Sequence, residues 1–283
     1  MTIRQKTITV VAAVLVVTTC LVYGFSRFYL ARSLERTETL QVTSDLERVL
    51  GVVDYALEAL DTQASDWSAW DDLYQYMKDK NDEFATTNLN LTSFTSNKTD
   101  LYVLLDESGR LVSGKSFDFA NEKEAPLPEG LAPYLSTGSP MVRMSSVESS
   151  FSGIIVLKEG AMFVAARPVI TSGRQGPVRG TLIMGRWFGE EQVKRFGKMT
   201  HLPVELFRLD GGSIPDDVRR VSSMLASARA KHVEFLDDRR MTGYAGLQDI
   251  LGRSALVVRT EAPRNFRSQA LAFLFLGAEE LAG

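Results

Sequence analysis

The stretch Asp66-Trp-Ser-Ala-Trp-Asp-Asp-Leu-Tyr-Gln-Tyr-Met77 carries two of the three tryptophans in the chain, and it runs on through Lys-Asp-Lys-Asn-Asp-Glu-Phe-Ala-Thr-Thr to Asn88. The two tryptophans stand three residues apart beside three aspartates, in a segment predicted to be helical. Large amphipathic aromatic side chains mixed with carboxylates favour a pocket rim or a specific packing joint over a plain core.

Helical spacing makes neighbours of Asp66 and Trp70, of Trp67 and Asp71, and of Trp70 and Tyr74. One interpretation is a pocket for a cationic or aromatic small molecule, bound by charge and cation–π contacts. The other is a structural joint, in which the tryptophans anchor a sheet and the aspartates pair with arginines elsewhere. The sequence leaves both open.

An apolar segment precedes this stretch, and no charged residue lies between Lys6 and Arg27. Such a run is long enough to cross a bilayer as a helix. Because no Ala-x-Ala-like cleavage site precedes Arg27, we expect an uncleaved transmembrane helix over residues 7–30, after a cytoplasmic tail of residues 1–6. Residues 263–283 resemble the start of a second, truncated transmembrane helix.

Composition excludes several classes of function. The 283 residues carry a formal net charge of −3, so no basic field indicates a nucleic-acid partner. The chain has only two histidines, and its one cysteine lies in the apolar run. It therefore has few residues that could form a zinc site or a Ser-His-Asp triad. We expect no catalytic residue, no metal and no cofactor in this chain.

Residues 31–80 are predicted to form one long stalk helix with an apolar heptad seam. The seam comprises Leu46, Leu50, Val53, Leu57, Leu60 and Ala64. Either it packs only on the domain of its own chain, or the helix also pairs with a partner subunit of a homodimer near the membrane. Under the second interpretation, charged residues at Leu50 and Leu57 should uncouple signalling and leave ligand binding intact.

From about residue 100 the pattern changes to short strands, which indicates an α+β fold with antiparallel sheets. Residues 81–200 are expected to form a larger distal lobe around a five-stranded sheet, with a loop over residues 125–140. Residues 201–262 are expected to form a smaller, membrane-proximal lobe with strands near residues 204–208, 231–236, 241–247 and 255–260.

Two arginines stand near the ends of predicted strands, at Arg167 and Arg186. A partly buried arginine needs a carboxylate or carbonyl partner. These two either capture a carboxylate-bearing ligand with a bidentate fork, or pair with Asp66, Asp71 or Asp72 to lock helix to sheet.

Five motifs occur in order: Asp66-Trp-Ser-Ala-Trp-Asp-Asp-Leu-Tyr, Asp106-Glu-Ser-Gly-Arg-Leu-Val-Ser-Gly, Ala165-Ala-Arg-Pro-Val-Ile, Gly176-Pro-Val-Arg-Gly-Thr-Leu-Ile-Met-Gly-Arg and Arg259-Thr-Glu-Ala-Pro-Arg. With this set, the chain over about residues 40–264 resembles type four of the CHASE families, the sensory extracellular domains associated with cyclases and histidine kinases.

The resemblance implies a PAS-like or Cache-like sensor outside the bacterial inner membrane, flanked by two membrane helices. It also implies a cytoplasmic output module beyond this chain, commonly a diguanylate cyclase, a phosphodiesterase or a histidine kinase. It supplies no ligand.

We therefore expect the periplasmic input domain of a transmembrane receptor that acts as a homodimer and binds an unknown small molecule. The alternative is a membrane-anchored binding or scaffold protein with no output of its own. An anchored enzyme using Asp66 with Asp71 or Asp72 as an acid/base pair is disfavoured, because carboxylates five or six residues apart on a helix diverge.

Overall fold

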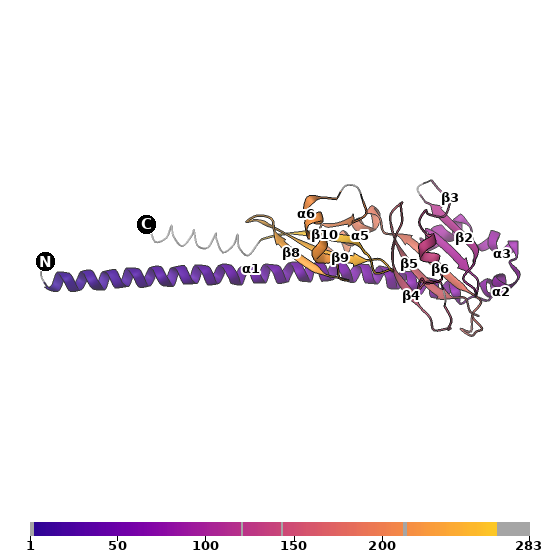
Figure 1. Ribbon diagram of the computed structural model, residues 1–283, viewed down its shortest axis with the longest axis horizontal. Helices are drawn as coiled ribbons and strands as arrows, with labels where there is room; N and C mark the ends of the chain where they lie inside the picture. The colour runs from indigo at the N-terminus through magenta and orange to yellow at the C-terminus, as the bar shows by residue number, and fades with distance from the viewer. Residues whose placement is uncertain (1–2, 120, 143, 212–213, 265–283) are drawn as a thin grey trace. The chain divides into compact units, whose positions relative to one another are not determined.

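The computed structural model describes residues 3–119, 121–142, 144–211 and 214–264 (Figure 1). The chain divides into a first unit of residues 1–44, 233–243 and 261–283 and a second unit of residues 45–232 and 244–260. The predicted second transmembrane segment falls almost wholly on residues 265–283, outside the described residues.

Helix α1 runs without interruption over Ile3–Ser68. Its residues Ile3–Ser26 are the one helical segment, within the described ranges, that is long and apolar enough to cross a membrane, and none of that segment is buried. The prediction of one helix as far as residue 80 is wrong at its C-terminal end. The chain leaves the helix after Ser68, and α2 (Asp71–Asp79) begins separately.

Two further short helices follow α2, namely α3 (Asp82–Asn88) and α4 (Leu91–Asn97). Each begins at an asparagine whose side chain accepts a backbone N–H: Asn81 from Phe84 and Asn90 from Ser93, both at 3.1 Å. Asparagine is among the preferred residues at this position because it satisfies an N–H that the helix leaves unpaired. The two asparagines therefore mark the starts of two separate short helices in this part of the chain.

The larger sheet has six antiparallel strands in the order β3-β2-β1-β6-β5-β4. Five of them correspond to the five predicted strands. The sixth, β3, was not predicted; it ends at the first residue of the predicted loop and pairs only with β2 at the sheet edge. The bounds are β1 Leu101–Leu105, β2 Leu111–Asp118, β3 Lys123–Ala125, β4 Phe151–Val156, β5 Ala161–Pro168 and β6 Thr181–Trp187.

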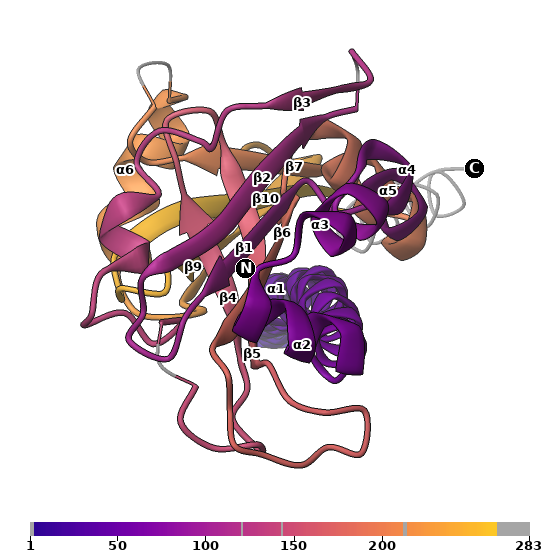
Figure 2. The same cartoon turned by 90° about the vertical axis from the view of Figure 1, so that its right-hand side faces the viewer.

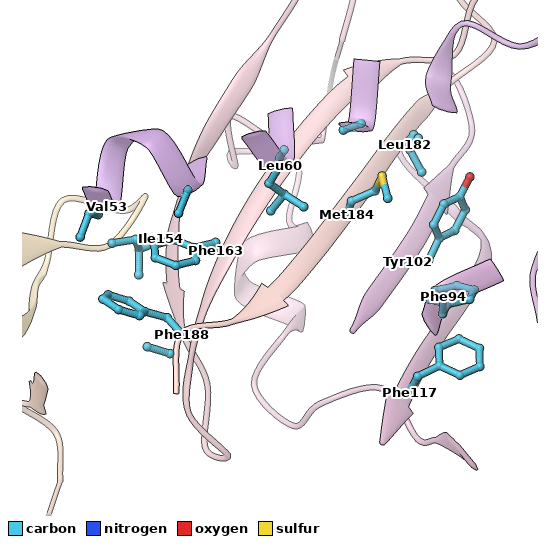
Figure 3. Packing of buried hydrophobic residues seen from close by; sticks show 14 of the residues in the cluster. Val53, Leu60, Phe94, Tyr102, Phe117, Ile154, Phe163, Leu182, Met184 and Phe188 are labelled. Atoms are coloured by element: carbon cyan, nitrogen blue, oxygen red, sulfur yellow. The ribbon is translucent and has the colours of Figure 1, made fainter. Parts of the chain in front are cut away.

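The main core lies between this sheet and the C-terminal half of α1. Figure 2 shows the end of α1 with α2, α3 and α4 on one side of β1, β2 and β6. Figure 3 shows Leu60 of α1 pointing towards Phe163 of β5 and Met184 of β6. Because side chains alternate along a strand, the opposite face of β1 packs under the segment that contains the short helix η1 (Ala132–Leu135).

Helix α5 (Glu190–Thr200) leads into a second antiparallel sheet, in the order β7-β10-β9-β8. The bounds of three of its strands lie within one residue of the predicted ranges, and the fourth, β10, extends three residues further, to Pro263. Helix α6 and the short helix η2 follow β7 and contribute Val218, Val221 and Leu225 to a separate core. The bounds are β7 Val204–Arg208, α6 Asp216–Ser222, η2 Ser223–Leu225, β8 Lys231–Phe235, β9 Arg240–Gln248 and β10 Ser254–Pro263.

The turn between β9 and β10 docks on strand β4. The Ile250 amide donates to the Ile154 carbonyl at 2.9 Å. A Cβ at Gly153 would lie 2.5 Å from the Ile250 side chain, so only glycine permits this approach. The buried Asp249 carboxylate accepts a hydrogen bond from the Tyr134 hydroxyl at 3.1 Å.

The first unit contains a buried ion pair. Nε of Arg264 donates to the Glu38 carboxylate at 2.9 Å, and the two side chains are only 3% and 2% exposed. The guanidinium also lies 4.4 Å from the centre of the Phe235 ring, and one of its nitrogens donates to the Asp237 carbonyl at 3.3 Å. Val42, Met241 and Ala262 form a small apolar cluster in the same unit.

Candidate functional site

The tryptophan–aspartate stretch spans a break in the helix. Ala69 forms a parallel bridge with Ile170, and Trp70 is extended with φ −135° and ψ 125°. The predicted i,i+4 pairing of Asp66 with Trp70 and of Trp67 with Asp71 is therefore wrong, because no continuous helix joins them. Trp70 and Tyr74 do keep helical spacing, since the Tyr74 amide donates to the Trp70 carbonyl at 2.9 Å.

The aromatic side chains pack on one another instead of lining a large pocket. Trp67 makes edge contacts with Trp70 and with Tyr102, both with ring centroids 5.9 Å apart. Trp70 packs on Phe84 at 5.3 Å, and Phe94 continues the row from Tyr102 at 5.6 Å. Offset and edge-to-face aromatic pairs of this kind stabilise specific packing beyond their buried area. This geometry favours the structural-joint interpretation.

The polar groups of this stretch hold the loop that follows β5. Asp71 accepts the Ser172 amide at 2.9 Å, and its own amide donates to the Ser172 hydroxyl at 3.0 Å. The Tyr74 hydroxyl donates to the Pro177 carbonyl at 3.0 Å. Asp66 is exposed and lies 3.8 Å from Arg174, so that ion pair contributes little.

Arg167 and Arg186 both tie the sheet to helix α1. Nε of Arg167 donates to Asp61 at 2.7 Å, and a second nitrogen reaches the other oxygen of the same carboxylate. Arg186 donates to the Lys98 carbonyl at 2.7 Å and to the Gln63 side-chain oxygen at 3.0 Å. The expectation that such arginines lock helix to sheet suits this geometry, but their partners are not Asp66, Asp71 or Asp72.

The heptad seam lies in the core of its own subunit. Every member is buried except Leu57, which is half-buried against the same cluster. A charge at Leu50 would therefore disrupt the core rather than act only on a subunit contact. The residues of the seam are Leu46, Leu50, Val53, Leu57, Leu60 and Ala64.

A groove of about 1170 Å³ lies in the second unit. It lies where α4, the end of β2, the segment after β3 and the start of α5 come together. Thr92, Ser96 and Lys98 come from α4 and its C-terminal cap, and Glu191 and Arg195 from α5. A groove of this size accommodates a small organic molecule.

Asp100 is the most buried charged residue of the groove lining, at 8% exposure. One carboxylate oxygen, Oδ2, accepts the Trp187 amide at 2.9 Å. Burial raises the pKa of Asp100 to about 6, although the Trp187 hydrogen bond and the positive charge of Arg186 oppose the shift and Glu191 adds to it. Perturbed carboxyl groups in clefts are typical of functional sites.

The structure brings only one of the predicted site residues to this groove, namely Arg186. Trp67 lines a separate cavity of about 10 Å³, roughly the size that holds one water molecule. Asp66, Trp70, Asp71, Tyr74 and Arg167 line neither hollow.

Sequence reasoning missed Asp100, Trp187 and Glu191. One signal was available in the sequence: Asp100 directly precedes a strand of five apolar residues. A carboxylate at the start of a buried strand is expected to be partly buried. In the described ranges, no group of three His, Cys, Asp or Glu side chains is placed to hold a metal ion.

Residues 52–207 match the CHASE4 domain family, and this match covers more than half of the chain. The chain belongs to the CHASE4 domain family, as the resemblance predicted. It is an extracellular sensory input domain of a signalling receptor, anchored to a membrane.

One relative of known role is the methanogenesis regulatory histidine kinase FilI of Methanothrix harundinacea (strain 6Ac). The two sequences are 22% identical over 271 residues, which is 96% of this chain and 30% of that protein. The chain thus spans less than a third of the relative's length.

Among solved structures, the fold is similar to the extracellular domain of the putative histidine kinase vpHK1S-Z8, with a TM-score of 0.51 and 10% identity over 83% of this chain and 98% of that one. The periplasmic domain of Vibrio cholerae LuxQ aligns with a TM-score of 0.43 and 13% identity over 78% and 99% of the two chains. The first of these likenesses supports the α+β sensor fold.

Proposed function

We propose that this domain detects a small molecule in the groove around Asp100 and controls an output module elsewhere in a longer protein. The observation that carries the proposal is the groove itself, which combines a volume of about 1170 Å³ with a buried carboxylate and a partly exposed indole, that of Trp187. Sites of this kind, concave and with a few convergent polar groups, are typical of ligand binding.

The output would be a histidine kinase, a diguanylate cyclase or a phosphodiesterase. The relative FilI, which its name describes as a histidine kinase, is long enough to hold such a module outside the region that this chain matches. The receptor would sit in the bacterial cytoplasmic membrane, with the described domain on the periplasmic side and α1 residues Ile3–Ser26 in the bilayer.

The response would begin at the groove wall. Arg186 lines the groove and donates to Gln63 of α1, so a ligand that shifts Arg186 acts directly on that helix. A small displacement of a packed helix between two arrangements is a common way for receptors to change state.

We also propose that the receptor is a homodimer, but not through the heptad seam, whose side chains are already buried. The opposite face of α1 remains available, and Tyr55 on that face is 59% exposed. An exposed tyrosine is a frequent anchor in protein interfaces.

A chimeric receptor tests the proposal. The chain would be joined to the kinase half of a histidine kinase that drives a reporter gene, and the reporter would be measured in media that do and do not switch it. The variant Ser96→Trp places an indole in the groove from an exposed position of α4, whereas Lys78→Trp places one on the exposed face of α2.

We expect Ser96→Trp to abolish switching and Lys78→Trp to preserve it. If the two variants switch alike, the groove is not the sensing site. If the original chimera never switches in any medium, although it is present in the membrane and folded, the alternative of an anchored binding or scaffold protein replaces the receptor proposal.

A further inference from the structure

We propose that the groove binds a small organic cation, with the Asp100 carboxylate as the acceptor for a protonated amine and Trp187 as part of the apolar wall. This inference rests on the proposed function, because it names the ligand class of the same groove. It is carried by the hydrogen bonding of Asp100, by the charges that line the groove and by the nature of its walls.

Asp100 has one oxygen committed to the protein and one that is not. Oδ2 accepts the Trp187 amide, while Oδ1 has no hydrogen-bond partner among the described residues. Oδ1 is not one of the buried polar atoms that lack a hydrogen-bond partner, so it remains accessible to solvent. A carboxylate has about four acceptor positions, so Asp100, which lines the groove, keeps capacity for a ligand N–H.

Acidic side chains outnumber basic ones around the groove. The carboxylates are Asp100, Asp118, Glu122, Glu159, Glu190 and Glu191. The basic residues are Lys98, Arg186 and Arg195. Lys194 pairs with Glu190 at 2.7 Å, and the positive charge of Arg208 acts on Glu159, so the net negative charge of the lining is smaller than the count of six to three. The remaining excess of carboxylates attracts cations and repels anions.

The most buried of the three basic groups has most of its N–H donors already bonded to the protein. Arg186 is held by the Lys98 carbonyl, the Gln63 side chain and the Asn97 carbonyl. Burial lowers the pKa of Arg186, and the neighbouring Arg195 lowers it further, while the negative charge of Asp100 opposes both effects. A carboxylate that binds Arg186 as a bidentate fork would therefore have to displace existing hydrogen bonds, whereas an amine on Asp100 would not.

The walls suit an organic cation better than a bare metal ion. No three carboxylates in the described ranges come close enough to surround one metal ion. Trp187 is half-buried in the lining, and Phe117 and Phe119 add apolar surface. Indole and phenyl rings beside a carboxylate bind the apolar body of an amine by burial and its charge by cation–π attraction.

The binding should depend on pH, because the carboxylate must be ionised. Asp100 titrates at about 6, and the charged groups that face it are Arg186 on β6 and Glu191 on α5. Below that pH the affinity for a monoamine should fall about tenfold for each pH unit, and above about pH 7 it should be constant. Phenethylamine stays protonated throughout this range, so the dependence belongs to the protein.

The experiment uses the full 283-residue chain in lipid nanodiscs and calorimetric titration at pH 7.5 and at pH 5. The probes are phenethylamine, putrescine and spermidine, with 2-phenylethanol and 3-phenylpropionate as neutral and anionic counterparts of the first. We expect at least one amine to bind with a Kd below 1 mM (about −4 kcal/mol) and the two counterparts to bind at least tenfold more weakly.

Three variants assign the binding to the groove. Asp100→Asn keeps an acceptor for the Trp187 amide but removes the charge, and it should weaken amine binding at least tenfold and abolish the pH dependence. Ser96→Trp should block binding by occupying the groove. Glu83→Gln, an exposed acid on α3 outside the groove, should bind amines like the original chain.

The inference is overturned if none of the three amines binds, if 3-phenylpropionate binds as well as phenethylamine, or if Glu83→Gln and Asp100→Asn weaken binding equally, which would indicate general attraction to an acidic surface. These results would leave the proposed function standing as long as Ser96→Trp still abolishes switching of the chimera. Should Asp100→Asn not fold, Ser96→Trp and the pH profile of the original chain decide the matter.

Discussion

Replacing Arg264 with methionine should greatly lower the free energy of local opening around Arg264 in the first unit. In the folded protein, the Arg264 guanidinium donates to Glu38 at 2.9 Å, and the two side chains are 3% and 2% exposed. Methionine fills much of the same volume but removes the guanidinium that donates to the buried Glu38 carboxylate. The replacement therefore isolates the charge pair from the packing around it.

The expected magnitude follows from this burial. Removing one partner of a buried, hydrogen-bonded ion pair costs about 3–5 kcal/mol, because the remaining charge stays desolvated. Replacing both partners by apolar residues of similar size is often close to neutral. The double variant Glu38→Leu/Arg264→Met should therefore be more stable than Arg264→Met alone, with a coupling of about 2–3 kcal/mol between the two positions.

Amide hydrogen exchange in nanodiscs is the appropriate assay, because it reports the free energy of local opening. The reporting amides are those of Arg264, which donates to the Arg239 carbonyl at 2.8 Å, and of Leu236, which donates to the Arg240 carbonyl at 3.1 Å. A loss of about 3 kcal/mol should make them exchange roughly a hundredfold faster.

The control is Arg240→Met, because Arg240 also forms an ion pair, with Asp237, but the two side chains are 60% and 43% exposed. That change should alter local stability by less than about 1 kcal/mol. The reasoning fails if Arg264→Met and Arg240→Met accelerate exchange to the same extent, or if the double variant is no more stable than Arg264→Met.

Three other predictions concern the second unit. Burial raises the pKa of Asp100 to about 6, so the folded state holds the proton more tightly than the unfolded chain, and the free energy of unfolding falls as pH rises from about 4 to about 6. Asp100→Asn should remove this pH dependence and add about 2–3 kcal/mol at pH 7. Urea unfolding at about pH 4 and pH 7 measures both effects, and an unchanged pH dependence would refute the prediction. Gly153→Ala should lower the free energy of unfolding by about 1–3 kcal/mol in the same assay, because the added Cβ would lie 2.5 Å from the Ile250 side chain. The control Gly138→Ala, where a Cβ would meet no atom within 4 Å, should change it by less than about 0.5 kcal/mol. Equal effects would contradict the close approach. Arg167→Met should cost about 1.5–3 kcal/mol, because it leaves the half-buried Asp61 carboxylate of α1 with only the long hydrogen bonds of the Ser150 hydroxyl. A cost below about 0.5 kcal/mol would show that this ion pair does not hold the sheet to the helix.

The strands could be predicted from sequence where apolar and turn residues alternate clearly, as in Leu101–Leu105 and its hairpin partner. Strand β3 could not, because its three residues read Lys-Glu-Ala and gain their structure only by pairing with β2. Likewise no proline or glycine marks the end of α1. The break at Ala69 arises from its bridge to Ile170, a contact a hundred residues away that overrides local helix propensity.

The candidate site was harder to predict for the same kind of reason. Arg167 and Arg186 could be singled out because buried arginines need partners, but the partners Asp61 and Gln63 are set by the rotation of α1 against the sheet. The groove depends on the meeting of α4, the end of β2, the segment after β3 and the start of α5, which local sequence patterns do not place together. Asp100 differs from the other aspartate of the groove in how deeply its side chain is buried, and a single sequence does not show the burial of one side chain.

The position of α1 in the core also limits how this domain could have been inherited. The family match begins at residue 52 and ends at 207, yet Leu46 and Leu50 before it, and Leu256 and Val258 after it, belong to the same buried cluster. A gene rearrangement that carried only residues 52–207 into a new protein would deliver a fold with its core exposed. A segment that is to fold by itself must therefore be wider than the matched residues and must include Leu46 and Val258.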